Sequence, residues 1–337
     1  MSRHKLANFL VQAWYRQHLI WLTLLLLPIA YLFRLVVLVR KYCYQYHLFT
    51  STCLPVPVVI VGNLTVVGTG KTPFVIWLVN YLQSNHIKVG VISRGYGGNN
   101  NQAPVFINNS SHAIEVGEEP ILIYQQTNCP VVVCKNRVAA ANYLLAKTSC
   151  EIIISDDGLQ HYALARDLEI ALIDGTKRYG NGQCLPAGPL REPLSRLTTV
   201  DYIIVTEGNS LQETVMQLLP QGLILLINPS QQVDKFMLQD KVIHAVAGIG
   251  HPERFFHMLR TLKLRFFEHS FPDHYHYTKE SLNFGEDAVI VMTEKDAIKC
   301  KEFATKDFYY LPVKAELPER FSGNLLTRVR QLLSKEH

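Results

Sequence analysis

The sequence has no closely spaced cysteine pair and carries only a modest charge. Its seven cysteines are an odd number, and none belongs to a C-x-x-C pattern. This usage favours free thiols in a reducing compartment over a zinc site or a disulfide framework. The net charge of +5 is too weak to indicate nucleic acid. It fits a smaller anionic partner, such as a nucleotide, a phospholipid or a phosphorylated substrate.

The chain also has no low-complexity tract and no internal repeat. Apolar residues make up 48% of it and charged residues 18%, which is typical of an ordered globular protein. A length of 337 residues suits two α/β domains better than one. No A-x-A cleavage site follows the first apolar run, so we do not expect a removable signal peptide.

Residues 20–33 form an almost wholly apolar run that ends at Arg34. A helix of this length spans about 21 Å, less than the roughly 30 Å hydrocarbon core of a bilayer. Continuing to Val39 would reach about 30 Å, so a spanning helix stays open, as does a helix buried in the core. Basic residues flank both ends of the run, whereas spanning helices usually show an asymmetry. We therefore expect residues 1–45 to form a membrane-associated helix embedded in one leaflet.

Residues 58–79 have the pattern of a strand, a glycine-containing loop and a helix. Val58–Val61 are four consecutive β-branched residues, and Gly-Lys-Thr precedes the helix. Such a loop binds phosphate through backbone N–H groups and the helix N-terminus, while Lys71 reaches the β/γ-phosphates and Thr72 can bind Mg²⁺. Thr65 departs from the usual spacing, which has glycine there, and a simple tight turn is the alternative. The expected nucleotide contacts are Gly62, Asn63, Thr65, Gly68, Thr69, Gly70, Lys71 and Thr72.

A second apolar strand, Ile152–Ile154, is followed by Ser155 and two aspartates, Asp156 and Asp157. An acidic residue at the end of such a strand holds Mg²⁺ directly or through water. Because parallel strands present their carboxyl ends at one edge of the sheet, these aspartates can converge with Lys71 and Thr72. The alternative is that they cap the next helix.

The remaining pattern alternates apolar strands with helices, which predicts a doubly wound parallel sheet of the P-loop NTPase type. A second, smaller α/β domain begins near Leu223. We predict four parts: the membrane-associated helix over 1–45, the P-loop core over 46–222, the smaller domain over 223–312, and a C-terminal helix over 313–337 that returns to the core.

Five motifs, taken in order, resemble the tetraacyldisaccharide 4′-kinase (lipid A 4′-kinase) family. They are Gly62-Asn63-Leu64-Thr65 with Gly68-Thr69-Gly70-Lys71-Thr72-Pro73, Ser93-Arg94-Gly95-Tyr96-Gly97, Asp156-Asp157-Gly158-Leu159-Gln160-His161, Leu185-Pro186-Ala187-Gly188-Pro189-Leu190-Arg191-Glu192-Pro193 and Thr293-Glu294-Lys295-Asp296. The resemblance runs from the apolar N-terminus to about Lys299. Each motif alone is modest, but the ordered set is specific.

The resemblance implies transfer of the γ-phosphate of ATP, with Mg²⁺, to the 4′-hydroxyl of a tetraacyldisaccharide 1-phosphate. It places the protein at the cytoplasmic face of the inner membrane and implies no nucleic acid and no protein partner. Thr72, Asp156, Asp157 and Gln160 would lie around the metal. The residues expected near the substrate or the transferred phosphoryl group are Arg94, Tyr96, Arg137, Gln160, His161 and Arg191.

The resemblance also implies a catalytic base, an aspartate assisted by a histidine. The matching positions are Glu118 and His274, and with Lys71 and Asp157 they make up the expected catalytic set. Two positions depart from the family pattern, Glu118 in place of aspartate and Val67 in place of glycine. Read from the residues alone, His274-Tyr275-His276 could be a metal site, although it lacks a third ligand in sequence.

Three rival functions weigh less. A membrane-partitioning ATPase or switch would need a second lysine near the start of the loop, and none lies between Cys53 and Gly70. A GTPase would need Asn/Thr-Lys-x-Asp, whereas Lys295 stands one place late in Thr293–Asp296. A soluble small-molecule kinase would use the N-terminal helix only as a structural element. Membrane partitioning distinguishes this last case.

Overall fold

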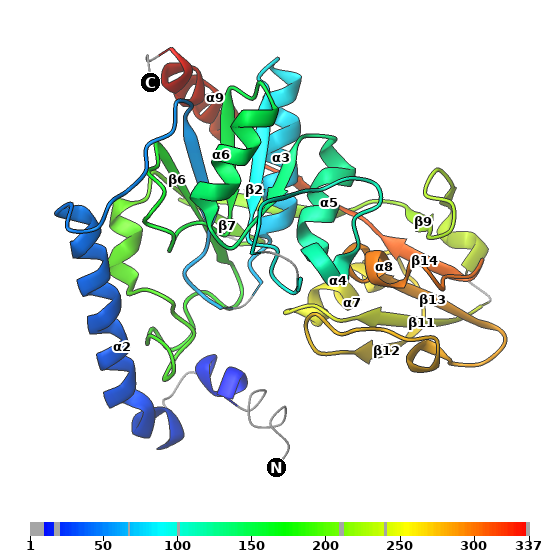
Figure 1. Cartoon of the computed structure of the whole chain (residues 1–337). Coiled ribbons are helices and arrows are strands. Elements are labelled where there is room, and N and C mark those ends of the chain that lie inside the picture. Colours follow the sequence, from blue (N-terminus) through cyan, green and yellow to red (C-terminus); the bar gives the residue numbers. More distant parts are fainter. Residues whose placement is uncertain are drawn as a thin grey trace.

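The structure, a computed structural model, describes residues 10–16, 21–66, 68–99, 102–208, 212–238 and 241–334. Val67, one of the two departures noted above, and residues 1–9 and 17–20 of the expected membrane-associated segment lie outside the described residues. In the described part, two sheets with their helices form the body of the molecule (Figure 1).

The larger sheet has nine strands in the order β15-β8-β7-β6-β1-β5-β2-β4-β3. The seven strands from β8 to β4 are parallel, and an antiparallel strand closes each edge. The bounds are β1 (Val58–Gly62), β2 (Val89–Ser93), β3 (Val105–Phe106), β4 (Val131–Val133), β5 (Ile152–Asp156), β6 (Leu168–Asp174), β7 (Tyr202–Thr206), β8 (Thr214–Pro220) and β15 (Val313–Glu316). The predicted α/β fold is confirmed.

Strand β1 is buried on both faces because its side chains alternate between two apolar clusters. Val59 and Val61 join the cluster built with α3, and Val58 and Ile60 join the cluster built with α6. This is why the strand reads as a continuous β-branched run instead of an alternating one. The helices of this layer are α3 (Lys71–Ser84), α4 (Ala113–Val116), α5 (Glu118–Thr127), α6 (Arg137–Lys147) and α9 (Glu319–Leu333), with a 3₁₀ turn, η1 (Leu194–Thr199).

The smaller sheet has six strands in the order β10-β9-β14-β13-β11-β12, of which the last four are parallel. Its strands are β9 (Leu223–Leu225), β10 (Gln232–Val233), β11 (Val242–Ala247), β12 (Phe266–Ser270), β13 (Ala288–Thr293) and β14 (Phe308–Leu311). Its helices are α7 (Pro252–Thr261) and α8 (Glu294–Cys300), with short turns η2 (Lys235–Leu238) and η3 (Glu280–Leu282). We call this unit the second domain and the larger sheet with its helices the core.

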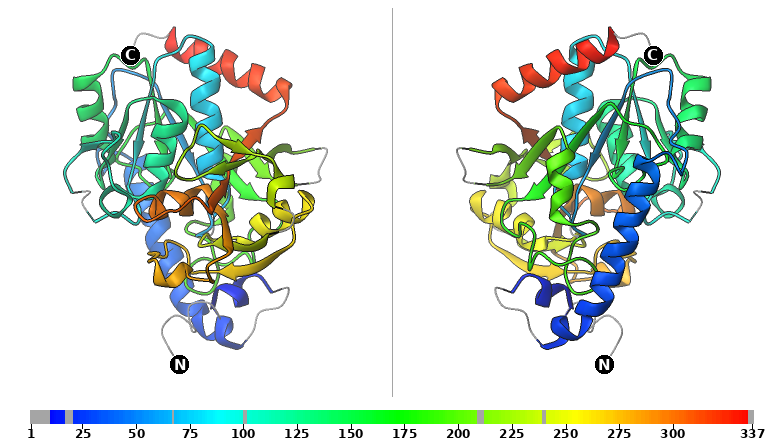
Figure 2. Two further views of the ribbon diagram at one scale, coloured as in Figure 1. Left: turned by 90° about the vertical axis from the view of Figure 1, so that its right-hand side faces the viewer. Right: turned by 90° about the vertical axis from the view of Figure 1, so that its left-hand side faces the viewer.

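The chain passes between the core and the second domain twice. It leaves the core after Pro220, enters the smaller sheet at Leu223, and returns between Leu311 and Val313, where β15 rejoins the larger sheet. Helix α9 then packs Phe321 against Trp77 of α3, with ring centroids 6.1 Å apart. Figure 2 shows α9 crossing the end of the core next to α3.

A charged contact also fixes the second domain to the carboxyl edge of the larger sheet. Arg254, in the first turns of α7, donates to Asp174 Oδ2 at 2.8 Å and lies 2.5 Å from Glu207 Oε2. Asp174 ends β6 and is buried, and Glu207 follows β7. Burying Asp174 is tolerable because it is paired and hydrogen-bonded.

The N-terminal apolar helix is longer than the run from residue 20 to 33 indicates. Helix α2 covers Trp21–Gln45, 25 residues, because Arg34 lies on an exposed part of the helix and does not interrupt it. It runs along the core on the side away from the second domain (Figure 1). Many of its apolar side chains are exposed, among them Leu25 at 66% and Leu32 at 61%. By length and composition alone, α2 could cross a membrane.

Some local elements differ from what the sequence pattern predicts. Residues 121–126 have the pattern of an amphipathic helix, and the helix begins earlier, at Glu118. Residues 278–283 also predict a helix, but only the short turn η3 forms there. Residues 264–267 predict a strand, and the strand runs from Phe266 to Ser270.

Candidate active site

The predicted phosphate-binding loop connects β1 to α3 at the carboxyl edge of the larger sheet, and the structure describes its residues 63–66 and 68–70. Gly70 precedes the helix with φ of 80°, a left-handed conformation that glycine adopts without strain. Lys71 is the first helical residue, and its Nζ donates to Asn63 Oδ1 at 3.0 Å. Thr72 is buried, and the Thr69 hydroxyl is buried without a hydrogen-bond partner. The loop thus holds a lysine and an unused hydroxyl at a helix N-terminus, as a phosphate site requires.

Asp156 is brought beside this loop because β5 pairs directly with β1, with Val61 opposite Asp156. It is 1% exposed, and its Oδ2 accepts a hydrogen bond from Ser93 Oγ at 3.1 Å. Its Oδ1 is buried without a partner. Burial, and then the charges of Glu119 and Asp157, raise the pKa of Asp156 to about 7. A buried carboxylate with an unused oxygen is short of positive charge, which suits a cation ligand.

Asp157 has the opposite environment, although it is the next residue. Arg191 Nη1 donates to its two oxygens at 3.0 and 2.9 Å, and Lys71 Nζ lies 3.4 Å from Oδ1. Burial would raise the pKa of Asp157, but the charges of Lys71 and Arg191 hold it well below its usual range. Asp157 has a φ of 48°, a strained value for a non-glycine residue that occurs often at functional sites.

Arg137 lies inside the protein and does not face an open site. It is 3% exposed, and its guanidinium donates to the backbone carbonyls of Asp156, Asp157 and Cys134 at 2.9, 3.3 and 3.3 Å. These bonds hold the backbone at the end of β5. Arg137 therefore orients Asp156 and Asp157 through their main chain, from within the protein. Arg94 and Tyr96, by contrast, are exposed on the loop after β2.

Gln160 joins the phosphate-binding loop to the segment that carries Arg191. Its amide nitrogen donates to the Asn63 carbonyl at 3.3 Å and to Glu192 Oε2 at 3.0 Å. Glu192 is 1% exposed and is also hydrogen-bonded by Tyr162. The structural role of Glu192 was not predicted, since its partners are distant in sequence. His161 lies in the same turn, and burial followed by the charge of Arg137 lowers its pKa to about 4.

Glu118 and His274 meet across the boundary between the core and the second domain. His274 Nδ1 lies 2.6 Å from Glu118 Oε1, and Glu118 is 4% exposed. Burial would raise the pKa of Glu118, but the hydrogen bond and charge of His274 lower it to about 2. Burial would lower the pKa of His274, and the bond to Glu118 raises it. At neutral pH Glu118 is therefore a carboxylate, held by a histidine 156 residues away.

The glycine-rich loop after β2 allows this pair to be approached closely. Gly97 has φ of 84°, and a Cβ there would lie 3.2 Å from His274 Nδ1 and 3.3 Å from Glu118 Oε2. The exposed ring of Tyr96 lies next to His274, with centroids 5.0 Å apart. A side chain at position 97 would crowd the pair, which explains the glycine.

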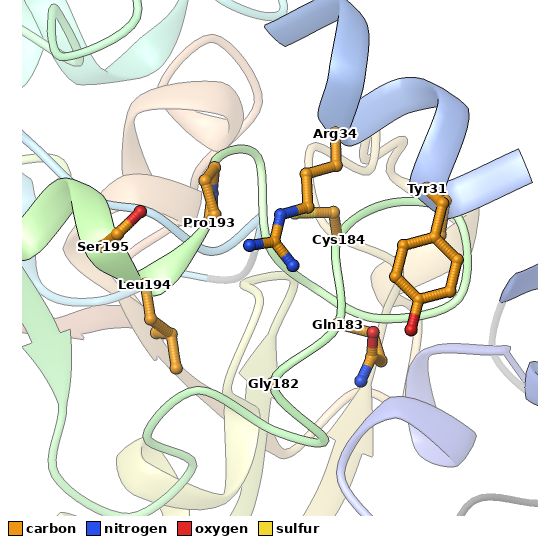
Figure 3. A pocket seen from close by; sticks show the side chains of 9 residues that line it. Tyr31, Arg34, Gly182, Gln183, Cys184, Pro193, Leu194 and Ser195 are labelled. Atoms are coloured by element: carbon orange, nitrogen blue, oxygen red, sulfur yellow. The ribbon is translucent and has the colours of Figure 1, made fainter. Parts of the chain in front are cut away.

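A cavity of about 200 Å³ lies between α2 and the segment leading to Arg191 (Figure 3). Tyr31 and Arg34 of α2 line one side, and residues 182–184 and 193–195 line the other. The apolar helix therefore borders the same loop that delivers Arg191 to Asp157.

The site also contains charged residues, Glu119 and Lys295, that were not among the predicted site residues. Glu119 contacts Lys295 of α8 at 2.6 Å. Burial would raise the pKa of Glu119, and the charges of Lys295 and then Lys71 lower it. No group of three or more histidine, cysteine or acidic side chains in the described residues is arranged to hold a metal by itself. Any ion would need ligands such as Thr72 or phosphate oxygens as well.

The carboxyl edge of the larger sheet combines a loop suited to phosphate, the Asp156 carboxylate with one unpartnered oxygen, and the Glu118 carboxylate paired with His274. With the α/β fold, these features define a nucleotide-dependent phosphotransferase. Comparison with known proteins identifies the family. The family model for tetraacyldisaccharide-1-P 4'-kinase matches residues 22–330, and the chain belongs to that family.

Individual relatives agree with this family. The chain is 45% identical over 332 residues to the tetraacyldisaccharide 4'-kinase of Methylobacillus flagellatus, covering 98% of each chain. It is 44% identical over 312 residues to that of Coxiella burnetii strain RSA 331, covering 93% of each. A crystal structure described as the "apo" form of LpxK from Aquifex aeolicus in complex with ATP superposes with a TM-score of 0.78. Its sequence identity is 29%, and the match covers 93% of this chain and 99% of that one.

Proposed function

We propose that Lys71, Asp156 and the Glu118–His274 pair act together at the carboxyl edge of the larger sheet to transfer the γ-phosphate of ATP to a lipid. The overall activity follows from the family: the protein is an ATP-dependent tetraacyldisaccharide 4′-kinase of lipid A biosynthesis. The observation that carries the assignment of roles is the convergence of these groups from β5, α3, α5 and the second domain.

Lys71 and the Thr69 hydroxyl, which is buried without a hydrogen-bond partner, bind the β- and γ-phosphates. Lys71 is hydrogen-bonded to Asn63 and paired with Asp157. These contacts hold its ammonium group at the edge of the sheet where the phosphates would bind. Arg191, held on Asp157, stands beside it as a second cation for the transferred phosphoryl group. Phosphoryl transfer depends mainly on such positioning and charge stabilisation.

Mg²⁺ fits the residues present. The unpartnered Asp156 Oδ1 and the buried Thr72 are the groups we assign to it. Asp157 is the weaker ligand because Arg191 and Lys71 already occupy its oxygens. Gln160 is not assigned as a direct ligand. Its amide nitrogen donates to the Asn63 carbonyl and to Glu192, so it would position the loop around the ion. When bound, the ion supplies charge neutralisation for the phosphates.

Glu118 takes the proton from the acceptor 4′-hydroxyl, and His274 orients the carboxylate. One oxygen of Glu118 is held by His274, which leaves Oε2 to face the hydroxyl. Because the two groups share a hydrogen bond, they titrate as one unit. A base placed in this way contributes about 10²–10⁴-fold to the rate.

The lipid substrate reaches the site from a membrane surface. Helix α2 exposes an apolar strip and borders the cavity next to the Arg191 segment (Figure 3). We assign the strip to one leaflet, at the cytoplasmic face of the inner membrane, where ATP is present. Tyr96, whose ring lies next to His274, and Arg94, exposed on the same loop, are the residues we assign to the sugar phosphate.

The test measures phosphate transfer from ATP to tetraacyldisaccharide 1-phosphate, with the phosphorylated position determined on the product. We expect 4′-phosphate from the wild type, and a loss of about 10²–10⁴-fold in kcat for Glu118→Gln with unchanged ATP affinity. Glu115→Gln, which alters an exposed glutamate of α4, is the matched control. Normal turnover by Glu118→Gln would refute Glu118 as base and leave Asp157 as the next candidate.

A further inference from the structure

Two consecutive glutamates begin α5, and each is bound by a residue of the second domain. Glu118 is bound by His274, and Lys295 Nζ lies 2.6 Å from Glu119 Oε1. The Lys295–Glu119 pair is largely buried, with both side chains 23% exposed. Lys295 is the second residue of α8, so this ion pair joins α8 directly to the turn that holds the proposed base.

Lys295 is not a free surface lysine, because α8 is held rigidly at the next residue. Asp296 is fully buried and accepts hydrogen bonds from Thr293 Oγ1 at 2.7 Å and from the Gly248 backbone N–H at 2.9 Å. Lys299 Nζ lies 2.8 Å from its other oxygen. These contacts fix the start of α8 to the loop before α7. Lys295 is therefore held in a fixed position relative to the rest of the second domain.

The charge of Lys295 reaches both members of the pair. After burial and the effects of His274, Lys295 contributes to lowering the pKa of Glu118. It also opposes the rise that Glu118 causes in the pKa of His274. A cation at this place therefore disfavours protonation of both groups.

Other charged groups around the pair make smaller or opposite contributions. Lys299 Nζ lies 4.0 Å from Glu118 Oε1, and Asp273 Oδ1 lies 3.8 Å from His274 Nε2. The Tyr96 ring covers His274 from the glycine-rich loop. Lys299 is paired more closely with Asp296, and Asp273 favours protonated His274. Lys295 is therefore the cation of α8 that contacts α5 more closely, at 2.6 Å against 4.0 Å.

We propose that Lys295 is a positioning residue for the Glu118–His274 pair. By binding Glu119, Lys295 holds the second domain against α5 in the position where His274 contacts Glu118. Its positive charge also favours the unprotonated form of the pair, which is the form that can accept a proton. This role rests on the proposed function of Glu118 as base. Lys295 itself does not contact the reacting atoms.

The pH profile distinguishes this role from a merely structural one. Without the Lys295 cation, the Glu118–His274 pair is protonated at a higher pH. The acidic limb of the kcat/KM profile therefore shifts to higher pH. For Lys295→Met we expect a shift on the order of half to one pH unit and a loss of roughly tenfold in kcat at neutral pH, with the KM for ATP unchanged. Lys295→Arg, which keeps the charge, should restore the wild-type limb and most of the rate.

Lys301→Met is the matched control, because Lys301 is exposed at the end of the same helix; its profile should equal the wild type. An unshifted limb in Lys295→Met, or an equal loss in Lys295→Arg, would overturn the role of Lys295. Glu118→Gln measured alongside separates the two ideas. If it is inactive while Lys295→Met is unshifted, only the positioning role fails; if it is active, the base assignment itself fails.

Discussion

Both sheets contain a parallel strand that leads through a glycine-containing loop into a helix, but the two loops end differently. In the core, β1 leads to a loop with a buried, unpartnered Thr69 hydroxyl and with Lys71 at the helix start. In the second domain, β11 leads through Gly248-Ile249-Gly250 to α7. There the Gly248 N–H is bound by Asp296, and the Gly250 carbonyl accepts from Lys177 at 3.5 Å.

The difference shows that strand, glycine loop and helix do not by themselves make a phosphate site. In the second loop the Gly248 N–H and the Gly250 carbonyl are occupied by protein partners, and the contact with Asp296 joins this loop to α8. The first loop keeps an unpartnered Thr69 hydroxyl and has a lysine at the helix start, as a phosphate site requires. The core loop is therefore assigned to binding and the second-domain loop to alignment. The following variants test that division.

The largest effect is expected at Lys71. Lys71→Ala removes the nearest compensating cation for phosphate charge, a contact made chiefly in the transition state, and should lower kcat/KM by about 10³-fold or more. Steady-state kinetics measure it, with Lys147→Ala, at an exposed position on α6, as the control. Turnover like that of the wild type would contradict the phosphate-binding assignment of the core loop.

Changing the second-domain loop should affect stability and leave nucleotide binding unchanged. Asp296→Asn removes a buried charge that accepts from Gly248 and Thr293 and pairs with Lys299, which costs about 3–5 kcal/mol. Denaturant unfolding followed with ATP titration should show a lower midpoint and an unchanged Kd for ATP. Asp287→Asn, at an exposed position, should change neither. A large loss of ATP affinity in Asp296→Asn would mean that the second loop also binds nucleotide.

The membrane contact is expected to depend on α2 and not on apolar exposure in general. Leu25→Asp with Leu32→Asp places charges on its exposed strip, and burying a leucine contributes about 1.5–3 kcal/mol, so the vesicle-bound fraction should fall at least tenfold. Phe267→Asp changes an equally exposed apolar residue of β12, 62% exposed, and should leave binding intact. Equal losses in both proteins would place the membrane contact elsewhere.

A smaller effect is expected for Glu118→Asp. The shorter side chain keeps the charge but withdraws the carboxylate by one methylene from His274, now 2.6 Å away. We expect about a tenfold loss in kcat, measured under saturating ATP. An increase in kcat would show that the surroundings of Glu118 still suit aspartate.

Contiguous features of the site were predictable from the residues themselves. The distant Glu118–His274 pair was expected only from the family resemblance, and other contacts between distant segments were not expected. The loop at Lys71 and the aspartates after β5 are local patterns whose meeting follows from parallel strand order. The inward orientation of Arg137 was not predictable, since it depends on how α6 packs against the end of β5. The Lys295–Glu119 contact joins residues 176 apart, and no periodicity encodes it.

The fold shows the same limit. The long β-branched strands of the core were readable because burial on both faces leaves a continuous apolar run. Short strands such as β9 and β15 were missed, because three or four residues carry too little periodicity. The apolar run over residues 20–33 is shorter than helix α2, because Arg34 interrupts the apolar pattern without ending the helix.

The most direct test of the account is a double-mutant cycle on Glu118 and His274, which joins the two domains in one chemical step. We predict that Glu118→Gln and His274→Ala each lower kcat by about 10²–10⁴-fold, with ATP affinity retained. The double variant should be little worse than either single variant, because the residues act as a unit. His276→Ala, at an exposed position two residues away, should be normal. Losses that multiply in the double variant would contradict the account, since the two residues would then act independently.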